Sequence, residues 1–209
     1  MKKITLSFEE AKPLINEGDI LLFSGQGWIS NLIKSAGETP YSHVAVASWV
    51  NGKDGILECV EFREKKGGRS INIEHAINDN PNLIDVYRPI KDFDSITFDL
   101  ATKNTIDSRK VFNGKKVTRT MRKMTGLPYG WKRIWWMIKY KLLIFRLFKK
   151  KTLVCDELSD IIYPVCSTAV AYAFNSNDYD LVKNRSDEWC EPGDIAKSAR
   201  INYLFTLSP

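Results

Sequence analysis

Residues 42–62 hold the pattern that decides the fold of this chain: SHVAVASWV is followed by NGKDG and then by ILECVEF. The outer segments are apolar and rich in β-branched and aromatic residues, which is typical of buried strands. The middle segment holds Asn51-Gly52 and Asp54-Gly55, two dipeptides that favour tight turns. The stretch therefore predicts a β-hairpin with a five-residue loop.

Patterns on both sides of this hairpin extend the predicted sheet. Short apolar or alternating segments predict further strands at GDILLF (18–23), RSINIE (69–74), LIDVYRPI (83–90) and close to the C-terminus. The segment SFEE (7–10) has the form of a capping box, in which Ser and Glu side chains bond each other's backbone N–H groups. A short helix is expected to follow it.

The second half of the chain is predicted to be mostly helical. Expected helices cover residues 27–37, about 74–78, 93–125 with an interruption at 113–114, 131–151, and 165–174. A sheet-rich first part followed by helices favours an α+β fold. In this fold a small antiparallel sheet packs on the helix that bears Cys166.

Length and composition predict a single domain, residues 1–209, with a substantial core. Of the 209 residues, 44% are hydrophobic and 11% are aromatic. The N-terminal stretch MKKITLSFEEAKPLI lacks the apolar run of an export signal. No stretch approaches the roughly 18 apolar residues of a membrane-spanning helix. We therefore expect a cytoplasmic protein.

The four cysteines are Cys59, Cys155, Cys166 and Cys190, and they form neither a CxxC pair nor a spacing typical of zinc sites. We expect reduced thiols, no metal site and no cofactor. Two disulfides stay formally open because the number is even. We interpret the three cysteines other than Cys166 as structural thiols and His75 as a surface residue.

Positive charge is concentrated in one part of the chain. Residues 108–155 hold fifteen of the 31 Lys and Arg residues and none of the 25 Asp and Glu residues, so this segment carries +15 and the remainder −9. We interpret residues 105–152 as a basic helical insertion, and we expect the apolar stripe of 131–151 to pack on the core.

The basic segment leaves several partners open. An arm at 131–151 lying on an anionic membrane would make the protein peripheral to that membrane. A basic rim that attracts an anionic substrate is a further alternative. No recognised nucleic-acid-binding module accompanies the charge, so we expect no nucleic-acid partner.

Three residues in suitable elements indicate a nucleophilic site. Cys166 lies at the start of a predicted helix, whose N–H groups and dipole favour a thiolate. His43 opens a buried strand and is suited to act as a base near neutral pH. Glu58, on the paired strand, is suited to orient the imidazole. Each residue alone is more often structural, but the combination favours catalysis.

The order and spacing of GDILLF, YSHVAVA, ILECV and VCSTAVAYAF resemble the circularly permuted NlpC/P60 papain-like family, with its YiiX/YebB-like branch nearest. The fragments PYGW (128–131) and EPGDI (191–195) are also similar to family positions. The order His, Glu, Cys reverses that of papain. The resemblance extends from Gly18 to about Ser198 and implies a papain-like core.

By matched position, the resemblance implies Cys166 as the nucleophile, His43 as the general base and Glu58 as the orienting residue. The hairpin keeps Glu61 open as an alternative third residue, because Glu61 shares the strand alternation of His43. With a five-residue loop, Glu58 would pair near Ser48 unless a bulge shifts the register.

The implied reaction is hydrolysis through an acyl-thioester intermediate, first of all by an amidase or peptidase acting on a peptide or amide substrate. The backbone N–H of Cys166 is expected to stabilise the oxyanion, and Tyr41 and Ser167 are candidate oxyanion or substrate contacts. One alternative is a lipid thioesterase or acyltransferase working at membranes on a lipid-type acyl substrate. The other is a non-catalytic basic membrane-binding module.

Overall fold

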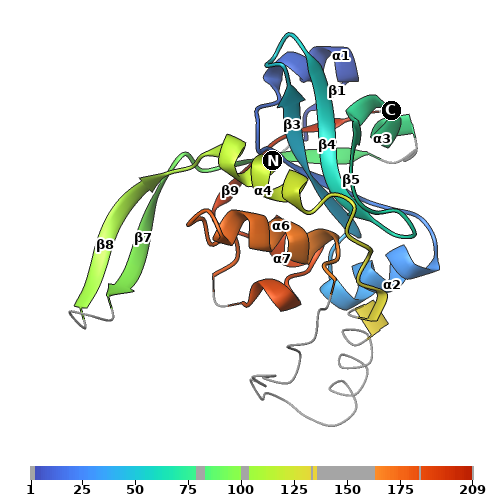
Figure 1. The fold of residues 1–209 in the computed structure, drawn as a ribbon. Helices are drawn as coiled ribbons and strands as arrows, with labels where there is room; N and C mark the ends of the chain where they lie inside the picture. The colour runs from blue at the N-terminus through green and yellow to red at the C-terminus, as the bar shows by residue number, and fades with distance from the viewer. Residues whose placement is uncertain are drawn as a thin grey trace.

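A computed structural model describes residues 3–78, 83–99, 104–132, 134–135, 163–183 and 185–208. Over these residues the chain forms a seven-stranded sheet with helices packed on it, and a separate two-stranded hairpin (Figure 1). The predicted α+β class is confirmed. Within the described residues, no helix is long and apolar enough to cross a membrane.

The main sheet has the strand order β1-β9-β6-β2-β3-β4-β5. Neighbouring strands are antiparallel except for β1, which runs parallel to β9. The strand bounds are Thr5–Leu6 for β1, Ile20–Phe23 for β2, His43–Val50 for β3, Ile56–Arg63 for β4, Gly67–Asn72 for β5, Ile84–Pro89 for β6 and Ile201–Leu207 for β9.

The hairpin of β3 and β4 forms as its sequence predicts. Val50 pairs with Ile56, which leaves a five-residue loop between the strands. Asn51 and Gly52 have φ angles of 62° and 78°. Asn and Gly tolerate this left-handed backbone better than other residues, so the turn chemistry determines the register of the whole hairpin.

Side chains of the sheet alternate between two buried layers. Val44 and Val46 of β3 belong to the layer that contains residues of α4 (Gly114–Lys123) and α6 (Cys166–Asn175). Ala45 and Ala47 belong to the opposite layer, with residues of α1 (Phe8–Ala11) and α3 (Ile73–Asn78). Helices therefore cover both faces of the central strands, and α6 is buried along most of its length.

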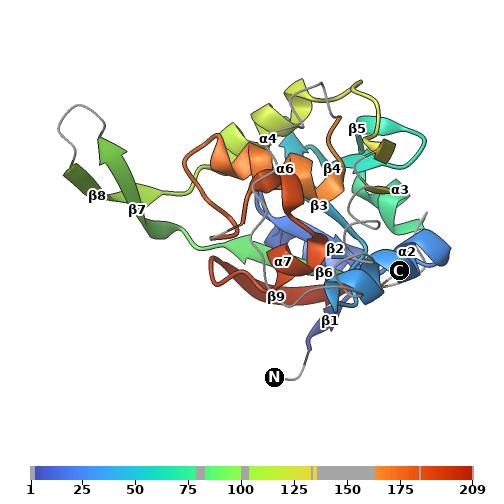
Figure 2. The ribbon, with the colours of Figure 1, turned by 90° about the horizontal axis from the view of Figure 1, so that it is seen from below.

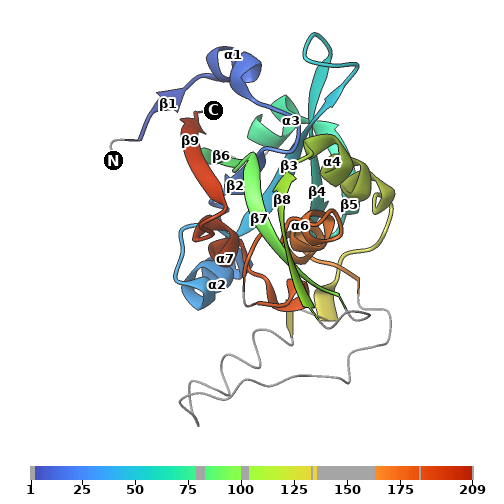
Figure 3. The ribbon, with the colours of Figure 1, turned by 90° about the vertical axis from the view of Figure 1, so that its left-hand side faces the viewer.

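Further helices lie in the chain between these elements. They are η1 (Lys12–Leu14), α2 (Trp28–Gly37), η2 (Asp187–Trp189) and α7 (Pro192–Ala196). In Figure 3, α1 lies at one end of the molecule and α2 and α7 lie together at the other. The capping box predicted at the start of α1 is present, with Ser7 and Glu10 in the two roles.

The prediction of helix over 93–125 is wrong for its first part. Strands β7 (Asp92–Asp99) and β8 (Asn104–Val111) pair as an antiparallel hairpin that projects away from the main sheet (Figure 2). Both strands are rich in β-branched and aromatic residues, which favour an extended backbone over a helix. Helix begins only at α4, where the Asn113 side chain accepts a hydrogen bond from Lys116 N.

The basic insertion expected at 105–152 is therefore not helical throughout, because it starts inside a strand. Residues 131–132 and 134–135 are helical, as predicted. The rest of the predicted 131–151 helix lies outside the described residues.

Candidate functional site

Cys166 is the first residue of α6 and is 4% exposed. The preceding Val165 is extended, and its N–H donates to Thr168 Oγ1 at 2.9 Å. The first helical hydrogen bond runs from Ala169 N to Val165 O, so the N–H groups of the first turn point out of the helix end beside Cys166. These groups and the helix dipole create a positive potential around the sulfur.

His43 is the first residue of β3, and its imidazole is held by a carboxylate on the neighbouring strand. His43 Nε2 lies 2.5 Å from Glu61 Oε2. Glu61 Oε1 in turn accepts from Arg69 Nε at 2.8 Å and from Arg69 Nη2 at 2.5 Å. His43 and Glu61 are 8% and 1% exposed, so this chain of contacts is buried.

The charges of this chain follow from its contacts. Burial works against protonation of His43, but the Glu61 carboxylate and then Cys166 outweigh it and raise the pKa of His43 to about 9. Burial likewise opposes ionisation of Glu61, but His43 and Arg69 outweigh it and lower the pKa of Glu61 to about 2. An imidazolium–carboxylate pair is therefore the form at neutral pH.

Cys166 completes this group, because its side chain lies close enough to His43 to help raise the pKa of the imidazole. Since Nε2 is engaged by Glu61, Nδ1 is the ring nitrogen available to the thiol. The structure therefore brings together Cys166, His43 and Glu61.

The preference for Glu58 over Glu61 is corrected. Glu61 pairs with Ala45, which lies two residues from His43 on the same side of β3, whereas Glu58 pairs with Ser48 and has the opposite alternation. Glu58 Oε2 accepts instead from Ser70 Oγ at 2.5 Å and from Arg122 Nη2 at 2.7 Å.

The two hydroxyls expected near the oxyanion are engaged elsewhere. The Tyr41 hydroxyl donates to Asp85 Oδ2, and the Ser167 hydroxyl donates to Cys190 O at 2.6 Å. A hydroxyl has one proton to donate, so neither proton is available at the sulfur of Cys166.

Tyr129, which sequence reasoning did not assign to the site, has its side chain beside Cys166. Burial, and then the interaction with Cys166, raises the pKa of Tyr129 well above its ordinary value. The tyrosine belongs to the fragment PYGW, which the family resemblance marked without giving it a role. The hydroxyl available near the sulfur is therefore that of Tyr129.

A close backbone approach places Tyr129 there. Gly130 N donates to Pro164 O at 3.1 Å, two residues before Cys166. A Cβ on Gly130 would lie 2.0 Å from Tyr163 O, so only glycine allows the two segments to approach this closely.

The other candidates lie away from this group. Cys59 and Cys190 are buried free thiols, and burial raises the pKa of each. His75 is on the exposed side of α3, and Cys155 lies outside the described residues. In the part of the chain that the structure describes, no group of three or more His, Cys, Asp or Glu side chains is arranged to hold a metal ion.

Comparison with known proteins gives a likeness of fold. No protein-family model matches the chain, and no curated protein matches it. The solved structure of YiiX from Escherichia coli O157:H7, described as a metalloprotein of DUF1105, matches with a TM-score of 0.51 and 15% identity. The match covers 93% of this chain and 98% of that chain. The YiiX-like resemblance is thus confirmed at the level of the fold.

Proposed function

We propose that this protein is a cysteine-dependent hydrolase of the permuted papain-like type, with Cys166 as nucleophile, His43 as general acid and base, and Glu61 as the orienting residue. The observation that carries the proposal is the buried contact of His43 with Glu61, beside a cysteine at the start of a helix. Neither folding nor packing requires a buried ion pair next to a buried thiol.

The reaction begins from a Cys166 thiolate beside the protonated His43, and the thiolate attacks the substrate carbonyl carbon. The tetrahedral oxyanion accepts hydrogen bonds from the backbone N–H of Cys166 and from the Tyr129 hydroxyl. The carbon–nitrogen bond then breaks, and His43 gives its proton to the leaving amine. Water, deprotonated by the now neutral His43, hydrolyses the thioester, and Cys166 leaves as a thiolate beside the protonated His43.

Glu61 acts through His43. Its carboxylate holds Nε2 and stabilises the imidazolium that forms at each transfer, while Arg69 holds the carboxylate in place. We rank an amide or peptide substrate first.

A lipid acyl substrate is the second candidate, and a pair of exposed aromatic side chains favours it. Trp28 and Trp135 are 65% and 57% exposed, and their ring centroids lie 6.4 Å apart. Tryptophan is enriched where proteins meet the membrane interface. Trp135 also follows shortly after Gly130, whose N–H bonds Pro164 O two residues before Cys166.

A metal centre does not fit this site, although the YiiX structure is described as that of a metalloprotein. Both oxygens of Glu61 are occupied, one by His43 and the other by Arg69. The residues of this site are therefore not arranged as metal ligands, and the proposed reaction does not use a metal ion.

The test is the rate of iodoacetamide alkylation against pH, read by mass spectrometry at each thiol. Cys59, Cys166 and Cys190 are all buried, so a difference in rate reports reactivity more than exposure. We expect Cys166 to react fastest at neutral pH and to slow in His43→Ala. If Cys166 reacts no faster than Cys59, the proposal is wrong.

A further inference from the structure

Helix α4 presents a row of like charges to solvent. Lys115, Arg119 and Lys123 are exposed and follow one another at spacings of four residues, so they share one side of the helix. Like charges at this spacing repel each other, and α4 contains no acidic residue to offset them. In the part of the chain that the structure describes, no ion pair involves any of the three.

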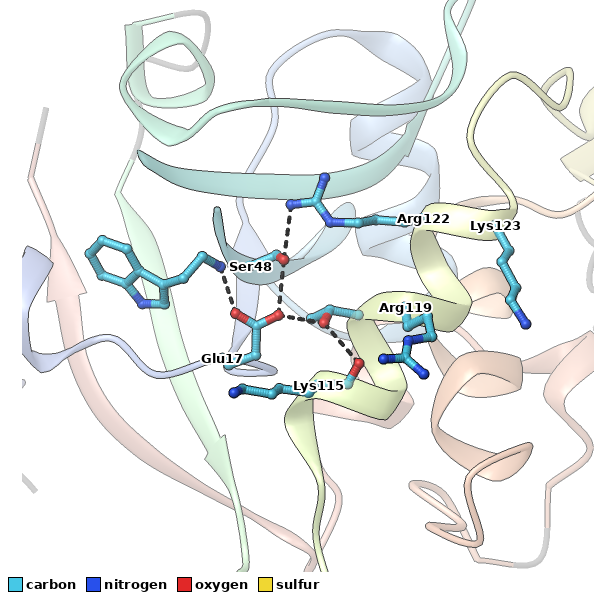
Figure 4. A pocket seen from close by; sticks show the side chains of 8 residues that line it. Glu17, Ser48, Lys115, Arg119, Arg122 and Lys123 are labelled. Carbon is cyan, nitrogen blue, oxygen red and sulfur yellow. Dashed lines mark hydrogen bonds between the residues drawn. The ribbon is translucent and has the colours of Figure 1, made fainter. Parts of the chain in front are cut away.

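These cations border an open hollow of about 390 Å³ (Figure 4). The side chains that line it are those of Glu17, Ser48, Trp49, Lys115, Thr118, Arg119, Arg122 and Lys123. Its size is within the range of sites for small ligands.

The only carboxylate among the described lining residues is already satisfied by neutral donors. Glu17 accepts from Ser48 Oγ at 2.9 Å, from Trp49 N at 2.6 Å and from the Thr118 hydroxyl. These bonds hold the carboxylate at the base of the hollow without using a cation. The hollow thus has one negative charge among its lining residues, and that charge is not paired with Lys115, Arg119 or Lys123.

Arg122 has a structural role in the same place. Its Nη2 donates to Glu58 Oε2 at 2.7 Å and to Ser48 Oγ at 3.0 Å, and its Nη1 donates to Ser70 Oγ at 3.1 Å. Figure 4 shows Arg122 turned toward Ser48, whereas Arg119 and Lys123 extend away from Glu17. Arg122 is therefore held in place by its own hydrogen bonds. The other cations that line the hollow, Lys115, Arg119 and Lys123, stay available to bind a ligand.

We propose that this hollow binds a phosphate-bearing anion, held by Lys115, Arg119 and Lys123. A phosphate group offers several oxygens and up to two negative charges, so it can bridge cations that lie one helical turn, about 5.4 Å, apart. The ligand is either a free phosphate compound or the headgroup of an anionic phospholipid.

This site is separate from the cysteine site. Ser48 lies five residues along β3 from His43, which is about 17 Å in an extended strand. Changes in the hollow should therefore leave Cys166 alkylation unchanged, so failure of this proposal is distinguishable from failure of the proposed hydrolase.

The experiment measures binding of inorganic pyrophosphate by calorimetry, and binding of phosphatidylcholine vesicles with and without phosphatidic acid by flotation. The variant is Lys115→Gln, Arg119→Gln, Lys123→Gln. The control removes the same charge from three exposed lysines elsewhere, Lys65→Gln, Lys66→Gln, Lys183→Gln. Circular dichroism and the Cys166 alkylation rate verify that both proteins are folded.

We expect the α4 variant to bind the phosphate probe at least about tenfold more weakly, because it loses charge-assisted hydrogen bonds to the ligand. The control variant should bind like the unchanged protein. Pyrophosphate binding identifies a free phosphate compound as the source, and binding only to vesicles with phosphatidic acid identifies a lipid headgroup. The proposal is overturned if neither probe binds, or if the control loses as much affinity as the α4 variant.

Discussion

At the scale of single residues, the property that matters most is the position of one carboxylate between two cations. Glu61 contacts His43 with one oxygen and Arg69 with the other, and all three lie on neighbouring strands. A buried carboxylate in this position stays ionised, and it keeps the imidazole oriented and charged. Both the proposed catalysis and the pH response of the fold depend on that position.

Replacing Glu61 should therefore damage turnover far more than replacing Glu58. Glu61→Gln removes the charge that orients His43, and we expect kcat/KM to fall at least about 100-fold. Glu58→Gln should stay close to the unchanged protein, because Glu58 contacts Ser70 and Arg122 instead. Equal losses in the two variants would contradict the assignment of Glu61.

The pH profile of turnover gives an independent readout. His43 must be protonated to release the leaving group, so kcat/KM should decline on the alkaline side near its pKa of about 9. Glu61 raises that pKa, so Glu61→Gln should move the decline to lower pH. A decline that stays in place in Glu61→Gln would show that another group controls it.

The same pair makes stability depend on pH. The pKa of His43 is raised from 6.5 to about 9, so its contribution is complete below pH 6.5 and is lost as pH rises toward 9. The pKa of Glu61 is lowered from 4.5 to about 2, so its contribution is complete above pH 4.5 and is lost as pH falls toward 2. The urea midpoint of unfolding should therefore be highest between pH 4.5 and pH 6.5. In the double variant His43→Gln, Glu61→Gln the midpoint should depend much less on pH.

At the scale of elements, the site is assembled by two segments that meet through glycines. Gly68 of β5 exchanges hydrogen bonds with the loop after α4: its N–H donates to Leu127 O at 2.9 Å, and Gly126 N donates to its carbonyl at 2.8 Å. Gly130 then bonds the segment that leads into α6. These contacts fix the segment between α4 and Gly130 against β5 at one end and against the residues that precede α6 at the other.

Gly130→Ala tests this assembly. The added Cβ would meet Tyr163 O at 2.0 Å, so the two segments must separate, at a cost of about 1–3 kcal/mol in the free energy of unfolding. Cys166 alkylation should change as well, because Tyr129 moves with the segment. Gly126→Ala is the matched control: it has a positive φ but nothing within 4 Å, so it adds backbone strain alone. Equal effects of the two substitutions on Cys166 alkylation would contradict the role of Gly130.

At the scale of the whole molecule, the exposed tryptophans and the hollow at α4 are distinct surfaces, and they can be tested separately. The double variant Trp28→Ala, Trp135→Ala should partition into phosphatidylcholine vesicles several-fold less than the unchanged protein. The difference should depend little on salt, because the contact of the tryptophans with the lipid is apolar. Tyr172→Ala, at another exposed aromatic, is the control. If the unchanged protein does not partition, the lipid alternative loses its structural support.

Local chemistry explains what the sequence determined by itself. Turn residues, caps and short apolar periods act over a few neighbouring residues, so the β3–β4 hairpin, the capping box and α6 were predictable. The strand alternation even points to Glu61, whereas the spacing of the family motif favours Glu58. Over 93–111 the helical prediction is wrong, although the β-branched residues of this segment favour strands.

Tertiary structure alone decided which polar groups meet at the cysteine. Tyr41 and Tyr129 are both buried tyrosines in apolar surroundings, and no local pattern tells which hydroxyl lies at Cys166. Asp85, 44 residues away, takes the proton of the first, and the approach of Gly130 to Pro164 places the second. Such pairings depend on how distant segments pack, because packing satisfies buried polar groups with whatever partners the fold brings within reach.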